Sequence, residues 1–225
     1  MMKRILIAGP SGTGKTTLAK YIEQKYQITR ITSKETRQVT TPQALEWEDR
    51  YDYRYSDNIG HQALINLQSQ YPEFGVSWQR AMLEARFRRF RDTKGDFVCD
   101  RSFIDNIVFM LTQVAHNATE QYIKSFLRTV FQGNRECGIT HLIWVRQARE
   151  QPQVEDNGSR VPNMFYQLMI DSVFQLVINE LVPRYSNEVG GKTPGMETMY
   201  SPTILEIKLW DWEDRIRLVD NFLQE

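Results

Sequence analysis

The sequence predicts an α/β fold, a three-layer sandwich in which helices cover both faces of a five-stranded parallel sheet. Short apolar runs alternate with stretches of helical periodicity along the 225 residues. The first apolar run leads directly into a glycine-rich turn and a helix. No Pro- or Ser-rich linker divides the chain into halves, so we expect a single domain over residues 1–225.

Five apolar runs have the length of buried strands: Arg4 to Ala8, Ile28 to Thr32, Asp96 to Asp100, His141 to Arg146, and Thr203 to Ile207. The segments with helical spacing are Lys15 to Lys25, Trp78 to Arg91, Ile104 to Ala115, Glu120 to Phe131, Met164 to Leu181, and Trp212 to Leu223. An alternation of this kind favours βαβ units, in which all strands run parallel.

Two stretches show neither pattern. The segment Thr40 to Asn58 is rich in tyrosine and acidic residues, and residues 184–202 contain Gly190-Gly191 and Pro194-Gly195, which are typical of a long loop. Loops of this length in a compact domain tend to be functional or disordered, and the sequence leaves both open.

Composition excludes several classes of protein. The chain has 28 basic and 28 acidic residues, so it has no net field that would draw it onto nucleic acid. Its two cysteines, Cys99 and Cys137, are too few for a disulfide framework, and its three histidines lack zinc-ligand spacing. No stretch is long enough to span a membrane, and no export signal is present. We expect a cytoplasmic protein without a membrane partner, and the oligomeric state stays open.

A phosphate-binding loop follows the first strand and reads Gly9-Pro10-Ser11-Gly12-Thr13-Gly14-Lys15-Thr16. In such a loop, glycines let successive backbone N–H groups turn inward around phosphate oxygens, Lys15 adds a positive charge, and Thr16 offers a hydroxyl to Mg²⁺. Thr17 continues into a helix whose N-terminal dipole points at the same anion. We therefore expect residues Gly9 to Thr17 to bind ATP together with Mg²⁺.

A second informative segment, Asp100-Arg101-Ser102, ends the third strand. A carboxylate in this position lies at the carboxyl edge of the sheet, beside the phosphate loop. There Asp100 can hold Mg²⁺ with Thr16 or accept a proton from an attacking hydroxyl. The guanidinium of Arg101 can make a bidentate contact with a phosphate. The alternative is that Asp100 caps the next helix and Arg101 is an ordinary surface charge.

Together these segments resemble the thymidylate-kinase-like and deoxynucleoside-kinase-like P-loop kinases. More narrowly, the chain resembles small bacteriophage kinases, including those that phosphorylate 5-hydroxymethyluracil within DNA. The likeness runs over residues 3–183. It implies a nucleoside monophosphate kinase-like fold, ATP and Mg²⁺ as cofactors, and the host cytoplasm as the compartment of a phage-encoded enzyme. It also implies that Lys15, Asp100 and Arg101 are catalytic, the last two beside the phosphoacceptor.

Residues for the acceptor follow from the same resemblance. Gln79, directly after Trp78, is similar to the Phe-Gln pair with which deoxynucleoside kinases read a base. A glutamine amide offers a donor and an acceptor, which matches the edge of a pyrimidine. The alternative is a core aromatic followed by an exposed polar residue. At the end of the second strand, Arg37 is a candidate for gripping an acceptor phosphate and Glu35 a candidate base.

Residues 146–163 correspond to the lid that closes over the nucleotide in the resembled family. Phosphoryl transfer depends on positioning and charge stabilisation, which suits arginines on a closing segment. Arg160, after the turn Asp156-Asn157-Gly158, is the preferred catalytic arginine of the lid, and Arg146 and Arg149 are expected to bind the nucleotide. An ordinary surface position is the alternative for each.

The predicted function is an ATP-dependent kinase with three open acceptors. The leading one is the hydroxymethyl group of 5-hydroxymethyluracil in phage DNA, and the others are a free pyrimidine nucleotide or nucleoside and the 5′ end of a polynucleotide. DNA contact would use the basic face of the helix that carries Arg80, Arg86, Arg88, Arg89 and Arg91. The alternative, which is the commoner case for a charged helix face, is that these arginines are exposed to solvent and bind no ligand. The alternative class, a nucleotide-dependent switch or mechanical ATPase, is disfavoured because the chain lacks an Asn-Lys-x-Asp segment, and Asp100 is followed by Arg101 rather than by Glu.

Overall fold

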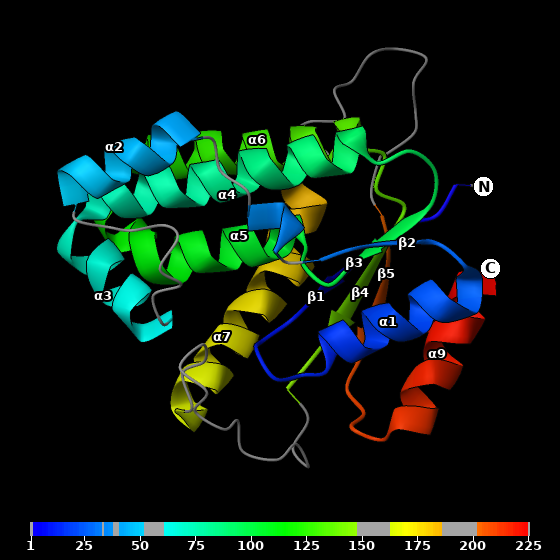
Figure 1. The fold of residues 1–225 in the computed structure, drawn as a ribbon. Coiled ribbons are helices and arrows are strands. Elements are labelled where there is room, and N and C mark those ends of the chain that lie inside the picture. Colours follow the sequence, from blue (N-terminus) through cyan, green and yellow to red (C-terminus); the bar gives the residue numbers. More distant parts are fainter. Residues whose placement is uncertain are drawn as a thin grey trace.

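The computed structural model describes residues 2–32, 34–37, 41–51, 61–147, 163–185 and 202–224. Five parallel strands form one sheet in the order β2-β3-β1-β4-β5 (Figure 1). The strands are β1 (Arg4–Ala8), β2 (Thr29–Ile31), β3 (Phe97–Cys99), β4 (His141–Val145) and β5 (Thr203–Ile207). The predicted fold class and the five predicted strands are confirmed.

Strand β1 lies at the centre of the sheet, where Leu6 pairs with Cys99 on one side and with Leu142 on the other. The chain leaves β1 toward β2 and β3, whereas β4 and β5 extend the sheet in the opposite direction. The loop after β1 therefore opens at the topological switch point, where α/β sheets bind their ligands. All of Ile5 to Ala8 is fully buried, because helices cover both faces.

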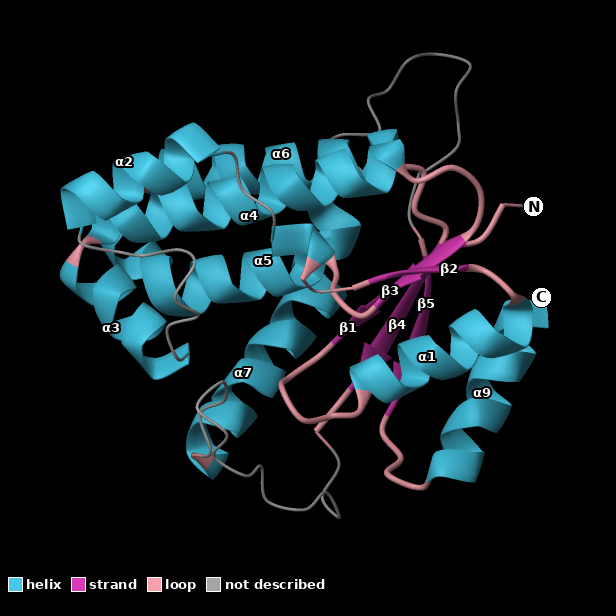
Figure 2. Ribbon diagram, in the orientation of Figure 1, coloured by secondary structure: helices cyan, strands magenta, loops and turns pink. Residues whose placement is uncertain are grey.

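Alternate residues of β1 enter two different cores. Ile5 and Ile7 pack in one core with residues of α1 (Lys15–Tyr26) and α9 (Trp212–Gln224). Leu6 and Ala8 pack in the other core. Its helices are α4 (Pro72–Asp92), α5 (Phe103–Phe109), α6 (Glu120–Glu136) and α7 (Met164–Leu176). Figure 2 shows these two helical layers on opposite sides of the sheet.

The predicted helices are present, with differences at their ends. Helix α4 begins at Pro72 rather than at Trp78. Proline suits the first turn of a helix because a backbone N–H in that position would have no acceptor within the helix. Helix α5 continues through the π-helical segment η3 (Met110–Val114) into η4 (Ala115–Asn117). Helix α7 continues into η5 (Val177–Leu181) in the same way.

One helix, α2 (Thr41–Tyr51), lies in the stretch that was expected to be irregular, and a second, α3 (His61–Gln70), lies after it in a segment for which no element was predicted. Helix α2 is held by Trp47, which is fully buried with its ring centroid 5.6 Å from that of Phe74 and 5.3 Å from that of Trp78. Its indole Nε1 donates to Ser77 Oγ at 3.1 Å. Tertiary packing therefore stabilises a helix whose acidic, tyrosine-rich sequence resembles a loop.

Most of the expected lid and of the expected loop at 184–202 lies outside the described residues. The single-domain organisation stays a prediction. In the described part of the chain, no helix combines the length and apolarity that crossing a lipid bilayer requires.

Candidate active site

The phosphate loop connects β1 to α1 and has the conformation that its glycines permit. Gly9, Gly12 and Gly14 have φ angles of 139°, 84° and 87°. At Gly9, a Cβ atom would lie 2.0 Å from the carbonyl oxygen of Val145, so the loop passes directly over the end of β4. Only glycine permits this close approach together with the left-handed backbone.

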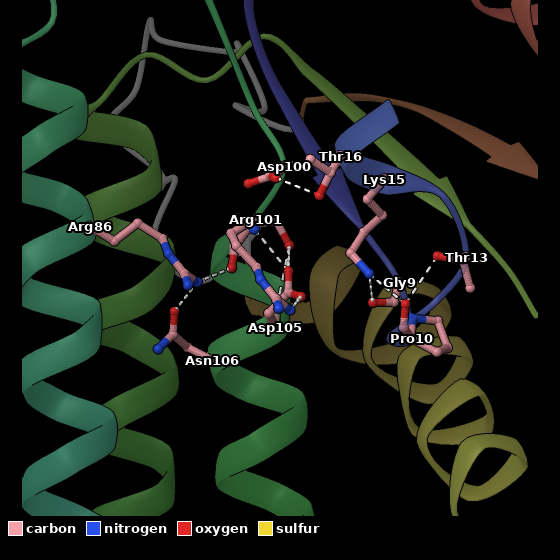
Figure 3. A network of polar contacts seen from close by, with 11 residues as sticks. Gly9, Pro10, Thr13, Lys15, Thr16, Arg86, Asp100, Arg101, Asp105 and Asn106 are labelled. Atoms are coloured by element: carbon pink, nitrogen blue, oxygen red, sulfur yellow. Dashed lines mark hydrogen bonds and ion pairs between the residues drawn. The ribbon is translucent and has the colours of Figure 1, made fainter. Parts of the chain in front are cut away.

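The lysine of the loop is buried and points into it (Figure 3). Lys15 Nζ donates to the carbonyl oxygen of Gly9 at 2.7 Å and also to that of Pro10. The hydroxyl of Thr13 donates to the same Pro10 oxygen at 3.0 Å. The ammonium group is thus held inside the loop, where the motif places it beside a bound phosphate.

The loop meets the acidic strand end as predicted. Thr16 Oγ1 donates to Asp100 Oδ2 at 2.8 Å, although the two residues are 84 positions apart (Figure 3). Asp100 is buried, and its other oxygen, Oδ1, has no hydrogen-bond partner among the described residues. A hydroxyl and a carboxylate oxygen next to a phosphate site are ligands that suit Mg²⁺, which usually takes one or two protein oxygens and completes its shell with phosphate and water. The residues present therefore fit this ion.

Helix α5 is capped by Ser102 and not by Asp100, the alternative that the sequence left open. The backbone N–H of Ser102 donates to Asp105 Oδ2 at 2.8 Å, and that of Asp105 donates to Ser102 Oγ at 3.3 Å. This reciprocal capping box lets the chain turn sharply after Asp100. Arg101 Nη1 is 3.3 Å from Asp105 Oδ1, so Asp105 also holds the side chain of Arg101.

Arg86 reaches the same turn from α4. Its Nη1 donates to the carbonyl oxygen of Ser102 and to Asn106 Oδ1 (Figure 3). Its Nε is buried without a hydrogen-bond partner among the described residues. Burial lowers the pKa of Arg86, with Asp105 acting in the opposite direction. The prediction that Arg86 lies on the basic surface of the helix is wrong, because its side chain is buried.

Other arginines of α4 have separate partners rather than forming one basic patch. Arg80 pairs with Glu84 at 2.9 Å on the exposed face of the helix. Arg91 lies 4.0 Å from Glu136 of α6. Arg89 Nη2 is 2.5 Å from Glu35 Oε1 in η1 (Glu35–Arg37). The contact of this helix with DNA stays a prediction.

Glu35 lies just after β2, at the same edge of the sheet as Asp100. Its Oε2 accepts from the backbone N–H of Thr32 at 2.7 Å and from the Thr32 hydroxyl at 2.8 Å. Burial alone would raise the pKa of Glu35, but the Thr32 hydrogen bonds and the charge of Arg89 hold it below its ordinary value. Glu35 is therefore an ionised carboxylate at neutral pH. The side chain of Arg37 lies outside the described part of the chain.

Trp78 and Gln79, the predicted base readers, are both buried. Trp78 packs in the aromatic cluster around Trp47, which agrees with the alternative that it is a core aromatic residue. Its contact with a substrate stays a prediction. Gln79 is 4% exposed, so the alternative of an exposed helix residue is wrong.

A chain of buried amides holds Gln79. Gln79 Nε2 donates to Gln68 Oε1 at 3.2 Å, Gln68 Nε2 donates to Gln113 Oε1 at 2.9 Å, and Gln113 Nε2 donates to the Tyr166 hydroxyl at 3.4 Å. Gln68 Nε2 also faces the carbonyl oxygen of Leu64 at 3.4 Å, which opposes a flip of the Gln68 amide. The Oε1 atom of Gln79 accepts no hydrogen bond from the described residues.

Arg146, predicted to bind the nucleotide, ends β4 within an ion-pair network. Its Nη2 lies 2.8 Å from Asp171 Oδ2, and its Nη1 lies 3.1 Å from Glu206 Oε1. Burial alone would lower the pKa of Arg146, but these two carboxylates outweigh it and raise the pKa. Nucleotide binding by Arg146 stays a prediction, and Arg149 and Arg160 lie outside the described residues.

Several polar residues that contact the candidate side chains or the phosphate loop were not assigned from the sequence: Gln68, Asn106, Gln113 and Arg215. Two signals were available. The spacing Ser102-x-x-Asp105 is a capping signature, and Gln79 and Arg86 are seven residues apart, about two helical turns, which puts them on one face of α4. No local signal points to Arg215, whose Nη1 donates to the carbonyl oxygen of Thr13 at 2.7 Å from the far end of the sequence.

Comparison with solved structures identifies the fold as that of the P-loop deoxynucleoside kinases. Deoxyadenosine kinase from M. mycoides with bound dATP matches with a TM-score of 0.59 and 15% identity over 100% of both chains. The same enzyme with bound dCTP matches with a TM-score of 0.52, 15% identity and 98% of each chain. With its products dCMP and dCDP bound, it matches with a TM-score of 0.50 at the same identity and coverage.

No curated protein matches the sequence. A family model described as an AAA domain matches residues 4–128, more than half of the chain. The matched region runs from β1 into α6 and contains the phosphate loop, Asp100 and the buried arginine of α4. The chain therefore belongs to this AAA domain family.

Proposed function

We propose that this protein is a kinase that transfers the γ-phosphoryl group of ATP to a deoxynucleoside or deoxynucleotide. The observation that carries the proposal is the 2.8 Å contact between Thr16 of the phosphate loop and the buried Asp100. The turn that begins directly beyond Asp100 carries Arg101, and Arg86 of α4 contacts it. The likeness of the whole chain to a deoxyadenosine kinase supports transfer to an acceptor over simple hydrolysis.

The nucleotide end of the site uses the phosphate loop. The backbone N–H groups of residues 9–17 and the ammonium of Lys15 bind the phosphates of ATP. Thr16 and Asp100 would hold Mg²⁺, which neutralises phosphate charge when it is bound. Arg160, Arg149 and Arg146 remain the candidates for closing over the nucleotide from the lid.

The acceptor end uses the turn after β2 and the helices α4 and α5. The acceptor hydroxyl oxygen bonds to the γ-phosphorus, the bond to the bridging oxygen of ADP breaks, and the hydroxyl proton passes to Glu35. Glu35 can accept this proton because it is ionised at neutral pH, although its lowered pKa makes it a weak base. Arg101 and Arg37 are the candidates for phosphate contact on this side, and Gln79, beside Trp78, reads the base.

The buried amide of Gln79 favours a pyrimidine acceptor, because it offers one acceptor and one donor on a fixed plane. A free deoxynucleoside is the first candidate, since the neighbouring fold belongs to an enzyme of that kind. The hydroxymethyl group of 5-hydroxymethyluracil in DNA is the second, and the exposed positions of Arg80, Arg88 and Arg91 along α4 favour it.

The test is incubation with γ-labelled ATP and Mg²⁺ against a panel of acceptors, with a chelated reaction as control. The panel contains the four deoxynucleosides, their monophosphates, plain DNA, DNA with a free 5′ hydroxyl, and DNA containing 5-hydroxymethyluracil. Label on a pyrimidine deoxynucleoside or its monophosphate is the expected result. Label only on the modified DNA selects the second candidate. Label released only as free phosphate would contradict the proposal and assign a nucleotide-dependent switch or ATPase.

A further inference from the structure

Arg215 lies in the first turn of α9, but its guanidinium belongs structurally to the phosphate loop. Asp211 caps the helix, since its Oδ1 accepts from the backbone N–H of Asp214 at 2.9 Å. Arg215 is 3% exposed. Its Nη1 donates to the carbonyl oxygen of Thr13 at 2.7 Å, and its Nε donates to that of Leu209 at 2.6 Å. Its position is therefore held from two sides.

The aromatic ring of Trp210 covers the guanidinium, with 4.9 Å between Cζ of Arg215 and the ring centroid. The rest of the helix lies beside α1 (Figure 1). It is held there by Asp220, which accepts hydrogen bonds from the hydroxyls of Tyr21 and Tyr26. Arg215 is therefore carried by a rigid element that packs against the helix that follows the phosphate loop.

The contact with Thr13 orients one peptide unit of the loop. In a trans peptide the carbonyl and the next N–H point in opposite directions, and the described chain has no cis peptide bond. Because the Thr13 oxygen faces Arg215, the N–H of Gly14 faces the other way, away from Arg215. A Cβ at position 14 would lie 3.0 Å from Nη1, so the glycine also makes room for the arginine. A charged donor on the carbonyl polarises the peptide and makes this N–H a stronger donor.

The charge of Arg215 has no carboxylate partner in the part of the chain that the structure describes. Its Nη2 is buried and has no hydrogen-bond partner there. Burial lowers the pKa of Arg215. Burying an unpaired guanidinium is unfavourable, and nearby negative charge would offset that cost. A polyphosphate in the loop supplies such charge.

We infer that Arg215 is a positioning residue for the phosphates of the nucleotide. It fixes the Thr13–Gly14 peptide with its N–H toward the phosphates and supplies a buried positive charge behind the loop. The inference rests on the proposed function only in requiring that ATP binds at residues 9–17, and it holds whichever acceptor is phosphorylated.

The experiment compares ATP and inorganic tripolyphosphate binding by calorimetry in the full-length protein and three variants. Arg215→Gln removes the positive charge. Arg215→Lys keeps the positive charge but replaces the planar guanidinium and its several N–H donors with a compact ammonium group. Arg217→Gln is the matched control, because it removes the same charge from the same helix at an exposed side chain that pairs with Asp214. We expect Arg215→Gln to weaken both ligands by about tenfold or more, Arg215→Lys to weaken them less, and Arg217→Gln to bind as the wild type does.

Thermal unfolding without ligand separates this role from a merely structural one. The inference expects Arg215→Gln to lose affinity for both ligands while its melting temperature falls little, because removal of the unpaired buried charge offsets the loss of the hydrogen bonds to Thr13 and Leu209. A lower melting temperature with unchanged affinity would overturn it, as would equal affinity of Arg215→Gln and wild type. If Arg215→Gln does not fold, the decision falls to Arg215→Lys, for which unchanged affinity for tripolyphosphate overturns the inference. Absence of ATP binding by the wild type would overturn both this inference and the proposed function.

Discussion

The two ends of the candidate site are built in different ways. At the nucleotide end, the loop of residues 9–16 supplies most of the contacts from one continuous segment, and Asp100 joins it from the neighbouring strand. At the acceptor end, each side chain is held by a partner from another element: Glu35 by Arg89, Gln79 by Gln68, and Arg86 by Asn106. The first end is therefore set mainly by backbone conformation and the second by side-chain contacts over long sequence distances.

The largest effect is expected at Lys15, which serves the nucleotide end alone. In Lys15→Ala, the charge that Lys15 holds inside the loop is lost, and the backbone amides alone face the phosphates. We expect kcat/KM to fall by about 100-fold or more in the label-transfer assay. Lys20→Ala, an exposed position on the same helix, should keep wild-type activity. Full activity of Lys15→Ala would mean that the nucleotide binds elsewhere.

Asp100→Asn probes the point where the two ends meet. The amide can still accept from Thr16, but the negative charge is gone. We expect kcat to fall by about 100-fold and the ATP dissociation constant to change by less than about threefold. The control is Asp96→Asn, just before β3 at the opposite end of the strand, where the carboxylate accepts from the backbone N–H of Lys3. Equal losses in turnover and ATP binding would make Asp100 an anchor for the nucleotide and not a catalytic group.

The nucleotide end was predictable because its determinants are local. The glycines, Lys15 and Thr16 lie within eight residues, between an apolar strand and a helix, and this pattern specifies the loop. The meeting of Thr16 with Asp100 also followed from the sequence, because the carboxyl ends of neighbouring parallel strands lie at one edge of the sheet.

The acceptor end was less predictable because its determinants are tertiary. Helix α2 is held by Trp47, which fills a cluster with Phe74 and Trp78, and the spacing of Trp47 and Tyr51 by one helical turn is too short a pattern to predict a helix in a segment rich in acidic residues. The basic pattern of α4 correctly indicated a helix but not that Arg86 turns inward to Ser102 and Asn106. Hydrophobic periodicity reports which face is buried, but not which polar side chain finds a buried partner.

Gln79→Leu tests the acceptor end by itself. We expect the KM for a pyrimidine deoxynucleoside to rise about tenfold, because one or two hydrogen bonds to the base are lost, while the KM for ATP stays the same. Gln68→Met should act in the same direction with a smaller effect, because it releases the amide of Gln79 without removing it. Gln132→Leu is the control, an exposed glutamine on α6 bonded to Glu136. A parallel rise in the KM for ATP would contradict the separation of the two ends.

The smallest effect is expected at the C-terminal half of α1, away from the phosphate loop, where Asp220 of α9 binds α1. Its carboxylate accepts from the hydroxyls of Tyr21 and Tyr26 at 2.8 and 2.9 Å and from Lys25 Nζ at 2.7 Å. Asp220→Asn leaves at least one of these donors without an acceptor. We expect the free energy of unfolding at pH 7 to fall by about 1–2 kcal/mol, measured by urea denaturation.

The pH dependence of this effect has a definite sign. Burial alone would raise the pKa of Asp220, but the hydrogen bonds from Lys25, Tyr21 and Tyr26 outweigh it and lower the pKa. The stabilisation is therefore complete above the pKa of an unfolded aspartate, about 4, and is lost as the pH falls through the lower value of the folded state. The stability difference between wild type and Asp220→Asn should shrink as the pH falls from about 5 toward 2. In Asp214→Asn, a more exposed position on the same helix, the loss of stability between pH 5 and 2 should match that of the wild type. A wild-type to Asp220→Asn difference that is constant over this range would show that the contact contributes no charge-dependent stability.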